Sequence, residues 1–155
     1  MFPKYLEYED ENIRISIRLD SFKTFILGGS ASGKTYFSEK LYKMKKYANL
    51  RQNIKLSIAW ENLYVCLNEK DVDGVYSVRN SIIILDRLDF YMNEQLINFI
   101  NDSNNIFILI TRYGVPGVDT THKNFKVLKL KTSGTKLLLE TIEAFSPEGA
   151  RLQVL

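Results

Sequence analysis

Cysteine and histidine are nearly absent from this chain, which has one of each, Cys66 and His122, among 155 residues. A single cysteine cannot form an internal disulfide, and the pair cannot build a zinc site of the cysteine–histidine type. We therefore expect Cys66 to be a buried thiol in a reducing compartment and His122 to be a surface-loop residue.

Long apolar runs are also missing. No stretch of about 18 apolar residues occurs, so no membrane span is predicted. Residues 1–12 mix Lys4 with several carboxylates and lack the apolar segment of a signal peptide. The expected location is the cytoplasm. No G-x-S-x-G segment is present, which argues against a serine hydrolase of that type.

The bulk composition is that of a globular protein, with 45% hydrophobic and 25% charged residues. A chain of 155 residues predicts a single domain, 1–155, that can bury a core without metals or disulfides. The formal net charge of +3 is mild. It permits an anionic ligand without arguing for nucleic acid.

One segment fits the pattern G-x-x-x-x-G-K-[ST] at every fixed position: Gly28-Gly29-Ser30-Ala31-Ser32-Gly33-Lys34-Thr35. Glycines let the backbone turn tightly enough for successive N–H groups to point at a phosphate chain. A helix that begins near Lys34 adds the partial positive charge of its N-terminus. In this pattern the lysine reaches the β- and γ-phosphates and the hydroxyl of Thr35 ligates Mg²⁺.

The flanking residues support this interpretation. The apolar residues 25–27 form a short strand that runs into Gly28, and helical periodicity follows Lys34. The segment thus resembles the Walker A loop of P-loop NTPases. The resemblance implies a catalytic role for Lys34 and a nucleotide site made of Gly28, Gly29, Ser30, Ala31, Ser32, Gly33, Lys34, Thr35 and Tyr36, with ATP and Mg²⁺ as cofactors.

A second signal lies at residues 81–86, where branched apolar residues lead to Asp86. Such a run predicts a parallel strand buried on both faces, and ligands of open α/β sheets bind where such strands end. A short helix over 90–102 and another buried strand over 106–110 complete a βαβ unit. The resemblance to P-loop proteins makes Asp86 the Walker B aspartate, a Mg²⁺ ligand. The alternative is an aspartate that caps the next turn.

The residue after Asp86 departs from the family pattern. ATPases of the AAA type usually have a water-polarising glutamate there, and this chain has Arg87. Asp89 is a candidate to orient water, although a helix N-cap at Asp89 or Asn93 is the competing interpretation. The strand over 106–110 ends at Thr111-Arg112, which resembles small AAA-type ATPases of phages and mobile elements. That resemblance implies that Arg112 stabilises transition-state charge; the alternative is a solvated arginine.

The remaining segments complete the expected fold. Alternation over 13–19 predicts a half-buried strand at a sheet edge, and residues 54–60 predict a second core strand. Residues 126–131 and 136–142 predict a hairpin, and 151–155 a last short strand. The expected class is α/β, a three-layer P-loop NTPase fold with a mainly parallel central sheet, antiparallel edge strands and a C-terminal β-hairpin.

Basic residues cluster on the helix after the loop and at its exit: Lys40, Lys43, Lys45, Lys46 and Arg51. Clustered positive charge can bind nucleic acid phosphates. It also suits a solvated helix end, where cations interact favourably with the helix dipole, and we favour this second interpretation.

The leading functional prediction is an ATP-binding P-loop NTPase with Mg²⁺-dependent hydrolysis that is slow or depends on a partner. Such units often act as homo-oligomers or with a protein partner. A nucleoside or nucleotide kinase is one alternative, because Asp86-Arg87 resembles the Asp-Arg pair of those enzymes. A nucleotide-binding module without hydrolysis is another. No Asn-Lys-x-Asp guanine motif is present, which lowers the expectation of GTP.

Overall fold

The computed structural model describes residues 4–20, 22–27, 34–112, 117–118, 125–133 and 136–141. Their strands are β1 (Tyr5–Glu9), β2 (Ile13–Arg18), β3 (Lys23–Leu27), β4 (Ile54–Leu56), β5 (Leu63–Cys66), β6 (Ile82–Leu85), β7 (Ile106–Thr111), β8 (Phe125–Ser133) and β9 (Lys136–Thr141). The α-helices are α1 (Lys34–Lys46) and α2 (Glu94–Asp102), and the 3-10 helices are η1 (Ala48–Leu50), η2 (Trp60–Asn62), η3 (Glu69–Gly74) and η4 (Leu88–Phe90).

The strands form one sheet in the order β4-β1-β2-β9-β8-β3-β7-β6-β5. Every pairing in the run β8-β3-β7-β6-β5 is parallel, which confirms the α/β class and the parallel central sheet. All four residues of β6 are buried, as expected for a strand covered on both faces. Within this run β7 lies between β3 and β6.

The rest of the sheet is mostly antiparallel. β8 and β9 form the predicted C-terminal hairpin, and β1 pairs antiparallel with both β2 and β4. The two parts of the sheet meet where β2 lies parallel to β9, along a short register that pairs Ile13 with Leu137 and Arg14 with Leu138. The expected last strand over 151–155 lies outside the described residues.

The prediction that the strand over 13–19 lies at an edge is wrong. β2 lies between β1 and β9, although its outward-facing side is exposed as expected. The reason is β1, in which Leu6 and Tyr8 are buried while Glu7 and Glu9 are exposed. Because carboxylates occupy the solvent face of β1, residues 1–12 look uniformly polar in the sequence, and the strand is not recognised there.

The predicted core strand over 54–60 is also wrong. Only Ile54–Leu56 is a strand, and β4 pairs with β1 at the outer edge of the sheet. The core strand is instead β5, which pairs with β6. With only four residues, β5 is too short to show a period in the sequence.

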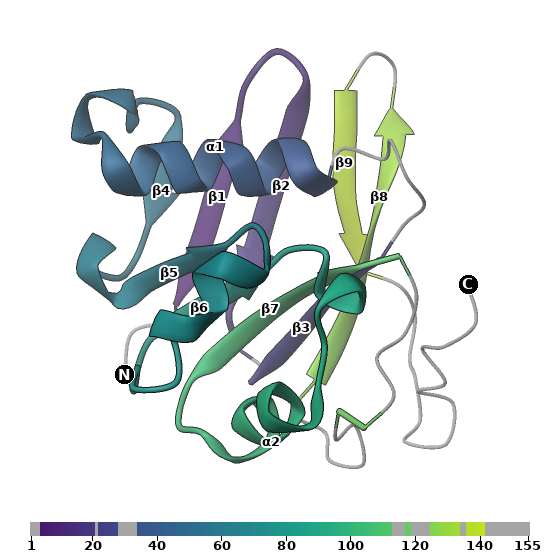
Figure 1. The fold of residues 1–155 in the computed structure, drawn as a ribbon. Coiled ribbons are helices and arrows are strands. Elements are labelled where there is room, and N and C mark those ends of the chain that lie inside the picture. Colours follow the sequence, from purple (N-terminus) through teal and green to yellow (C-terminus); the bar gives the residue numbers. More distant parts are fainter. Residues whose placement is uncertain are drawn as a thin grey trace.

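The two helices cover opposite faces of the sheet (Figure 1). Phe37, Leu41 and Met44 of α1 join one core cluster, which includes Ile26 of β3 and Ile84 of β6. Leu96, Phe99 and Ile100 of α2 join a second cluster on the other face, which includes the alternate residues Phe25 of β3 and Ile83 of β6. This arrangement agrees with a three-layer α/β fold, and the buried thiol of Cys66 belongs to the second cluster.

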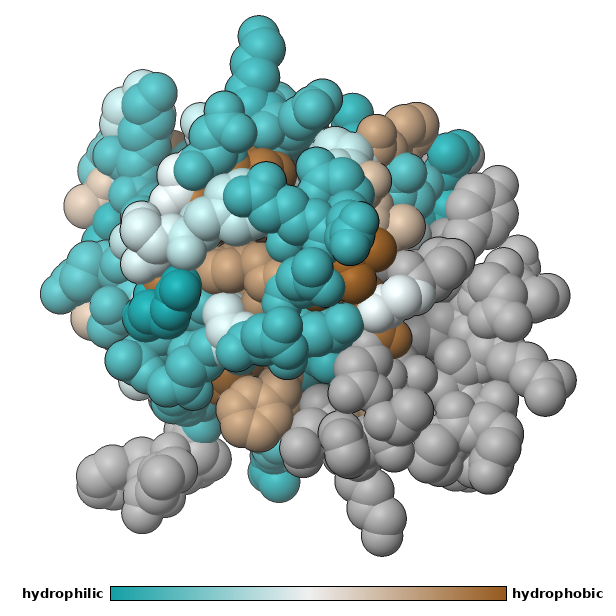
Figure 2. Space-filling view, turned by 60° about the horizontal axis from the view of Figure 1, so that its bottom comes forward, coloured by the Kyte–Doolittle hydropathy of each residue, from teal (hydrophilic) through white to brown (hydrophobic). Residues whose placement is uncertain are grey.

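The surface is mainly polar. Figure 2 shows a face on which hydrophilic side chains surround small areas of hydrophobic colour. Among the described residues, no helix has the length and apolar character needed to cross a membrane.

Candidate functional site

Polar residues gather where three parallel strands end. β3 leads into residues 28–33 and then Lys34, β6 leads into Asp86, and β7 ends at Thr111. The register pairs Leu27 with Thr111, so β3 and β7 end level with one another. Because carboxyl ends of parallel strands share one edge, these residues face the same region, where ligands of open α/β sheets bind.

Lys34 and Asp86 are both buried at this edge, at 8% and 1% exposure. Burial lowers the pKa of Lys34, and the charges of Asp86 and Asp89 partly oppose that shift. Burial also raises the pKa of Asp86 to about 6, against the opposing effects of Arg87, Lys34 and Thr35. Each charge thus supports the other, but neither fully offsets the loss of water.

Asp86 has a well-anchored backbone and an unsatisfied side chain. Its N–H donates to the carbonyl of Cys66 at 2.9 Å, and its own carbonyl accepts from the Tyr91 hydroxyl at 2.6 Å. Among the described residues neither carboxylate oxygen has a well-formed hydrogen bond, although both are buried and the backbone of Arg87 and the hydroxyl of Thr35 lie close enough to lower the carboxyl pKa. Buried polar atoms are nearly always paired, so a carboxylate held in this way fits a group that brings positive charge.

The side chains near Asp86 limit which metal ion could bind there. The described residues contain no group of three or more histidine, cysteine, aspartate or glutamate side chains that could hold a metal ion. One carboxylate next to the hydroxyl of Thr35 suits Mg²⁺, which keeps several waters and takes its other ligands from substrate phosphates. Thr35 and Asp86, the predicted metal ligands, are thus brought together.

Asp89 and Arg112 form a second pair at the same edge. Arg112 Nε donates to Asp89 Oδ2 at 3.4 Å, and the Arg112 guanidinium lies 4.8 Å from the centre of the Phe90 ring. The other oxygen, Asp89 Oδ1, is buried and has no hydrogen-bond partner among the described residues. Arg112 is therefore oriented by a carboxylate and a ring. The N-cap of α2 is Asn93, whose side chain accepts from Leu96 N at 2.8 Å.

The remaining predicted site residues are not found at this edge of the sheet among the described residues, or have another role. Gly28, Gly29, Ser30, Ala31, Ser32 and Gly33 lie outside the described residues, as does His122. The side chain of Tyr36 takes part in a hydrogen-bond network that the sequence prediction missed. Its hydroxyl donates to Asp10 Oδ2, which also accepts from the Tyr8 hydroxyl at 2.7 Å.

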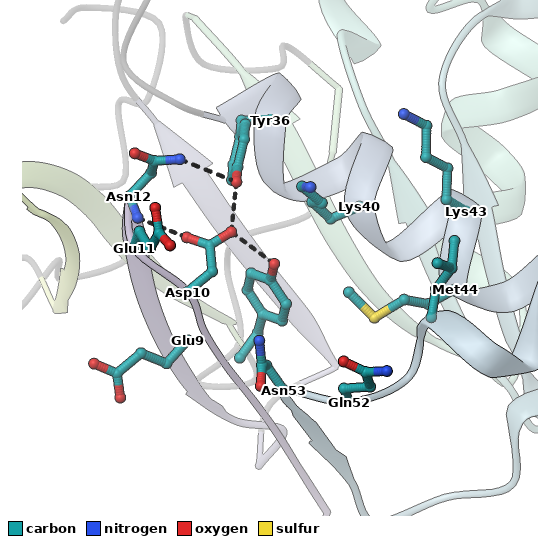
Figure 3. A pocket seen from close by; sticks show the side chains of 12 residues that line it. Glu9, Asp10, Glu11, Asn12, Tyr36, Lys40, Lys43, Met44, Gln52 and Asn53 are labelled. Carbon is teal, nitrogen blue, oxygen red and sulfur yellow. Dashed lines mark hydrogen bonds between the residues drawn. The ribbon is translucent and has the colours of Figure 1, made fainter.

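The Asp10 network joins the start of α1 to the turn between β1 and β2 (Figure 3). Asp10 Oδ1 accepts from the backbone N–H groups of Asn12 and Ile13, at 2.7 and 2.9 Å. Burial acts to raise the pKa of Asp10, but the hydrogen bonds from Tyr36 and Tyr8 outweigh it, and the pKa is lowered. The only local sign of this network in the sequence is an aspartate before a turn. Its contacts with the two tyrosines cannot be recognised from the sequence.

A cavity of about 680 Å³ lies beside this network, between α1 and the β1–β2 turn. Its lining is mixed, with Glu9 and Glu11 on one side and Lys40 and Lys43 on α1 (Figure 3). Since all four hydrogen bonds to Asp10 come from within the protein, the carboxylate is already satisfied. We interpret the network as a structural brace.

Four members of the basic cluster contact other residues, with Lys40 and Lys46 over the rings of Tyr36 and Tyr47, and Arg51 and Lys45 in hydrogen bonds. Arg51 donates from Nε to the carbonyl of Met44 at 2.7 Å and from Nη2 to that of Lys45 at 3.1 Å. Its guanidinium also lies 4.2 Å from the centre of the Trp60 ring. Lys45 Nζ donates to the carbonyl of Trp60 at 2.7 Å. These contacts favour the structural interpretation of the cluster over a nucleic-acid face.

Comparison with known proteins adds no assignment to this geometry. Models of known protein families do not match the chain, and a search of curated proteins finds no match either.

Proposed function

We propose that the chain is a P-loop NTPase that binds ATP with Mg²⁺ and hydrolyses it slowly or only when a partner completes the site. The observation that carries the proposal is the Asp86 carboxylate: it is buried, neither of its oxygens has a well-formed hydrogen bond among the described residues, and it lies beside Lys34 and Thr35. A bound cation with its phosphates supplies the positive charge and the ligands that this carboxylate lacks.

The residues divide into clear roles under this proposal. The N–H groups of residues 28–33 and the start of α1 surround the phosphates, Lys34 Nζ contacts the β- and γ-phosphates, and Thr35 and Asp86 hold Mg²⁺. When bound, Mg²⁺ neutralises charge on the phosphate oxygens. Since β7 lies between β3 and β6, Thr111 and Arg112 come between the end of β3 and Asp86. From there Arg112 can meet charge that develops on the terminal phosphate.

The proposed slow turnover rests on Asp89 and Arg87. Asp89 is the carboxylate best placed to orient water, but one of its oxygens is bound to Arg112. The position directly after Asp86 carries a guanidinium, which cannot accept a proton from water. A partner or a second copy that draws Arg112 toward the phosphates would free Asp89 for this task.

We propose the cytoplasm as the location of the protein.

The direct test is to incubate the purified chain with γ-labelled ATP and Mg²⁺, with and without nucleosides and nucleotides as acceptors. We expect saturable binding and slow release of free phosphate without an acceptor. Lys34→Ala removes the phosphate contact, while Lys43→Ala removes an equal charge from the exposed face of the same helix and serves as the matched control.

The products separate the alternatives. Transfer of label to an acceptor would make the protein a kinase, and tight binding without any product would make it a nucleotide-binding module. If ATP does not bind, or if Lys34→Ala binds and turns over ATP like the unaltered chain, the proposal is wrong.

A further inference from the structure

Arg87 has an unusual backbone at the edge of the proposed site. It adopts the left-handed conformation, with φ 56° and ψ 38°. Among the described residues, only Asn80 and Arg87 combine a positive φ with a side chain other than glycine. Asparagine tolerates this region, but arginine enters it at a cost in free energy. Such strain is found where function or the surrounding structure requires it.

The left-handed turn brings the Arg87 side chain to Thr35. Arg87 Nε donates to Thr35 Oγ1 at 3.5 Å, a contact between residues 52 positions apart in the chain. The side chain is exposed, and no carboxylate of the described residues forms an ion pair with it. Thr35 is therefore its one hydrogen-bond partner there.

This contact involves the oxygen that the proposed function assigns to Mg²⁺. A guanidinium and Mg²⁺ at the same hydroxyl oxygen are two positive charges at close range, so the contact from Arg87 opposes metal binding. The guanidinium also places its positive charge next to Asp86, where it favours the ionised carboxylate. In the structure described, Arg87 thus provides a positive charge close to both proposed metal ligands.

We propose that Arg87 is the site's own counter-cation, which lets it bind a nucleoside triphosphate without Mg²⁺ and is displaced from Thr35 when Mg²⁺ enters. The inference rests on the proposed function and adds a ligand class, the metal-free triphosphate. A guanidinium suits this task because its planar N–H donors match phosphate oxygens. Mg²⁺ and the guanidinium repel one another, so only one of them can stay at Thr35.

The test measures the dissociation constant of ATP for each variant, once in EDTA and once in saturating Mg²⁺. Arg87→Gly removes the side chain and suits the left-handed backbone, so the variant is not expected to misfold. Arg87→Lys keeps the charge without the planar fork. Lys43→Ala controls for the loss of one positive charge from the protein surface.

We expect Arg87→Gly to weaken metal-free binding by about tenfold or more, the size of a charge-assisted hydrogen bond, while binding with Mg²⁺ stays equal or tightens. In EDTA, the dissociation constant of Arg87→Lys should lie between those of the unaltered chain and Arg87→Gly. Lys43→Ala should change the dissociation constant in neither condition. An equal loss in both conditions, or no loss in EDTA, would overturn the inference while the proposed function stands. If the unaltered chain binds ATP in neither condition, both fail together.

Discussion

Asp86 carries a free-energy cost in the ligand-free protein, because its charge is buried and its oxygens have no well-formed hydrogen bonds among the described residues. The cost is visible in its pKa, which burial raises from 3.8 to about 6 despite nearby Arg87, Lys34 and Thr35. A side chain kept at such a cost is explained by a ligand more readily than by folding. The contribution of Asp86 to the free energy of unfolding should therefore depend on pH and on whether a ligand is bound.

Asp86→Asn should stabilise the metal-free protein above pH 6 and have little effect near pH 4. A carboxyl whose folded pKa is raised is fully stabilising below its unfolded value of 3.8 and loses that contribution as pH rises to about 6. The variant escapes this loss, which amounts to at most about 3 kcal/mol. Urea unfolding in EDTA at several pH values measures the difference. A difference that stays constant from about pH 4 to 8 would show that Asp86 is not held in this way.

Tyr36→Phe should lower the free energy of unfolding by about 1.5 kcal/mol, because it removes a hydrogen bond to the ionised Asp10. Tyr42→Phe on the same helix is the matched control, since its hydroxyl has no hydrogen bond among the described residues. Denaturant titration of both variants provides the measurement. Equal stabilities for the two would argue that the Asp10 network is not a brace.

Sequence alone could predict the site residues that follow buried strands. An apolar run ends at Asp86 and another at Thr111, and Lys34 and Thr35 belong to a local pattern, so the sequence indicates all four as candidates. Contacts between distant residues leave no such trace. The Asp89–Arg112 pair and the turn of Arg87 toward Thr35 depend on how the ends of β6 and β7 and the start of α1 meet in three dimensions.

At the scale of elements, the C-terminal end of α1 depends on a residue that the sequence presents as part of a basic cluster. Arg51 lies beyond the helix and turns back to donate to two carbonyls of its last turn, Met44 and Lys45. Those carbonyls lack partners within the helix. The Trp60 ring packs on the guanidinium and connects this end of α1 to the segment before β5.

Arg51→Ala should therefore destabilise the protein by about 1–2 kcal/mol, through the lost cap and the lost stacking on Trp60. Lys46→Ala removes the same charge from the last turn of α1 and should cost about 0.5 kcal/mol or less. Thermal unfolding of both variants measures this difference. Similar losses for the two would mean that the charge at the helix end matters and the Arg51 contacts do not.

The length of a helix or strand and the exposure of its side chains decide whether the sequence predicts it. β6 and β7 are continuous apolar runs, and α1 has a clear helical period, so each was found near its observed position. β1 and β4 lie in the outer part of the sheet, where exposed polar side chains mask their pattern. Pairing order cannot be read from periodicity at all, which is why β2 was placed at an edge.

At the scale of the whole molecule, α1 connects the two parts of the sheet. The parallel and antiparallel parts share only the short β2–β9 register, but α1 crosses the face that both present (Figure 1). Its core cluster contains Ile15 and Ile17 of β2 together with Ile26 and Ile84 of the parallel part. The helix that begins at Lys34 therefore also holds the sheet together. A ligand at its start acts on an element that spans the molecule.

Calorimetric titration with a non-hydrolysable ATP analogue and Mg²⁺ measures whether Lys34, Thr35 and Asp86 bind a nucleoside triphosphate. We expect saturable binding at one site per chain. Lys34→Ala should bind the analogue about 10- to 100-fold more weakly, because a charge-assisted contact is lost. Lys43→Ala should stay within about twofold of the unaltered chain. No binding by the unaltered chain, or equal affinities for the two lysine variants, would contradict the proposed binding site.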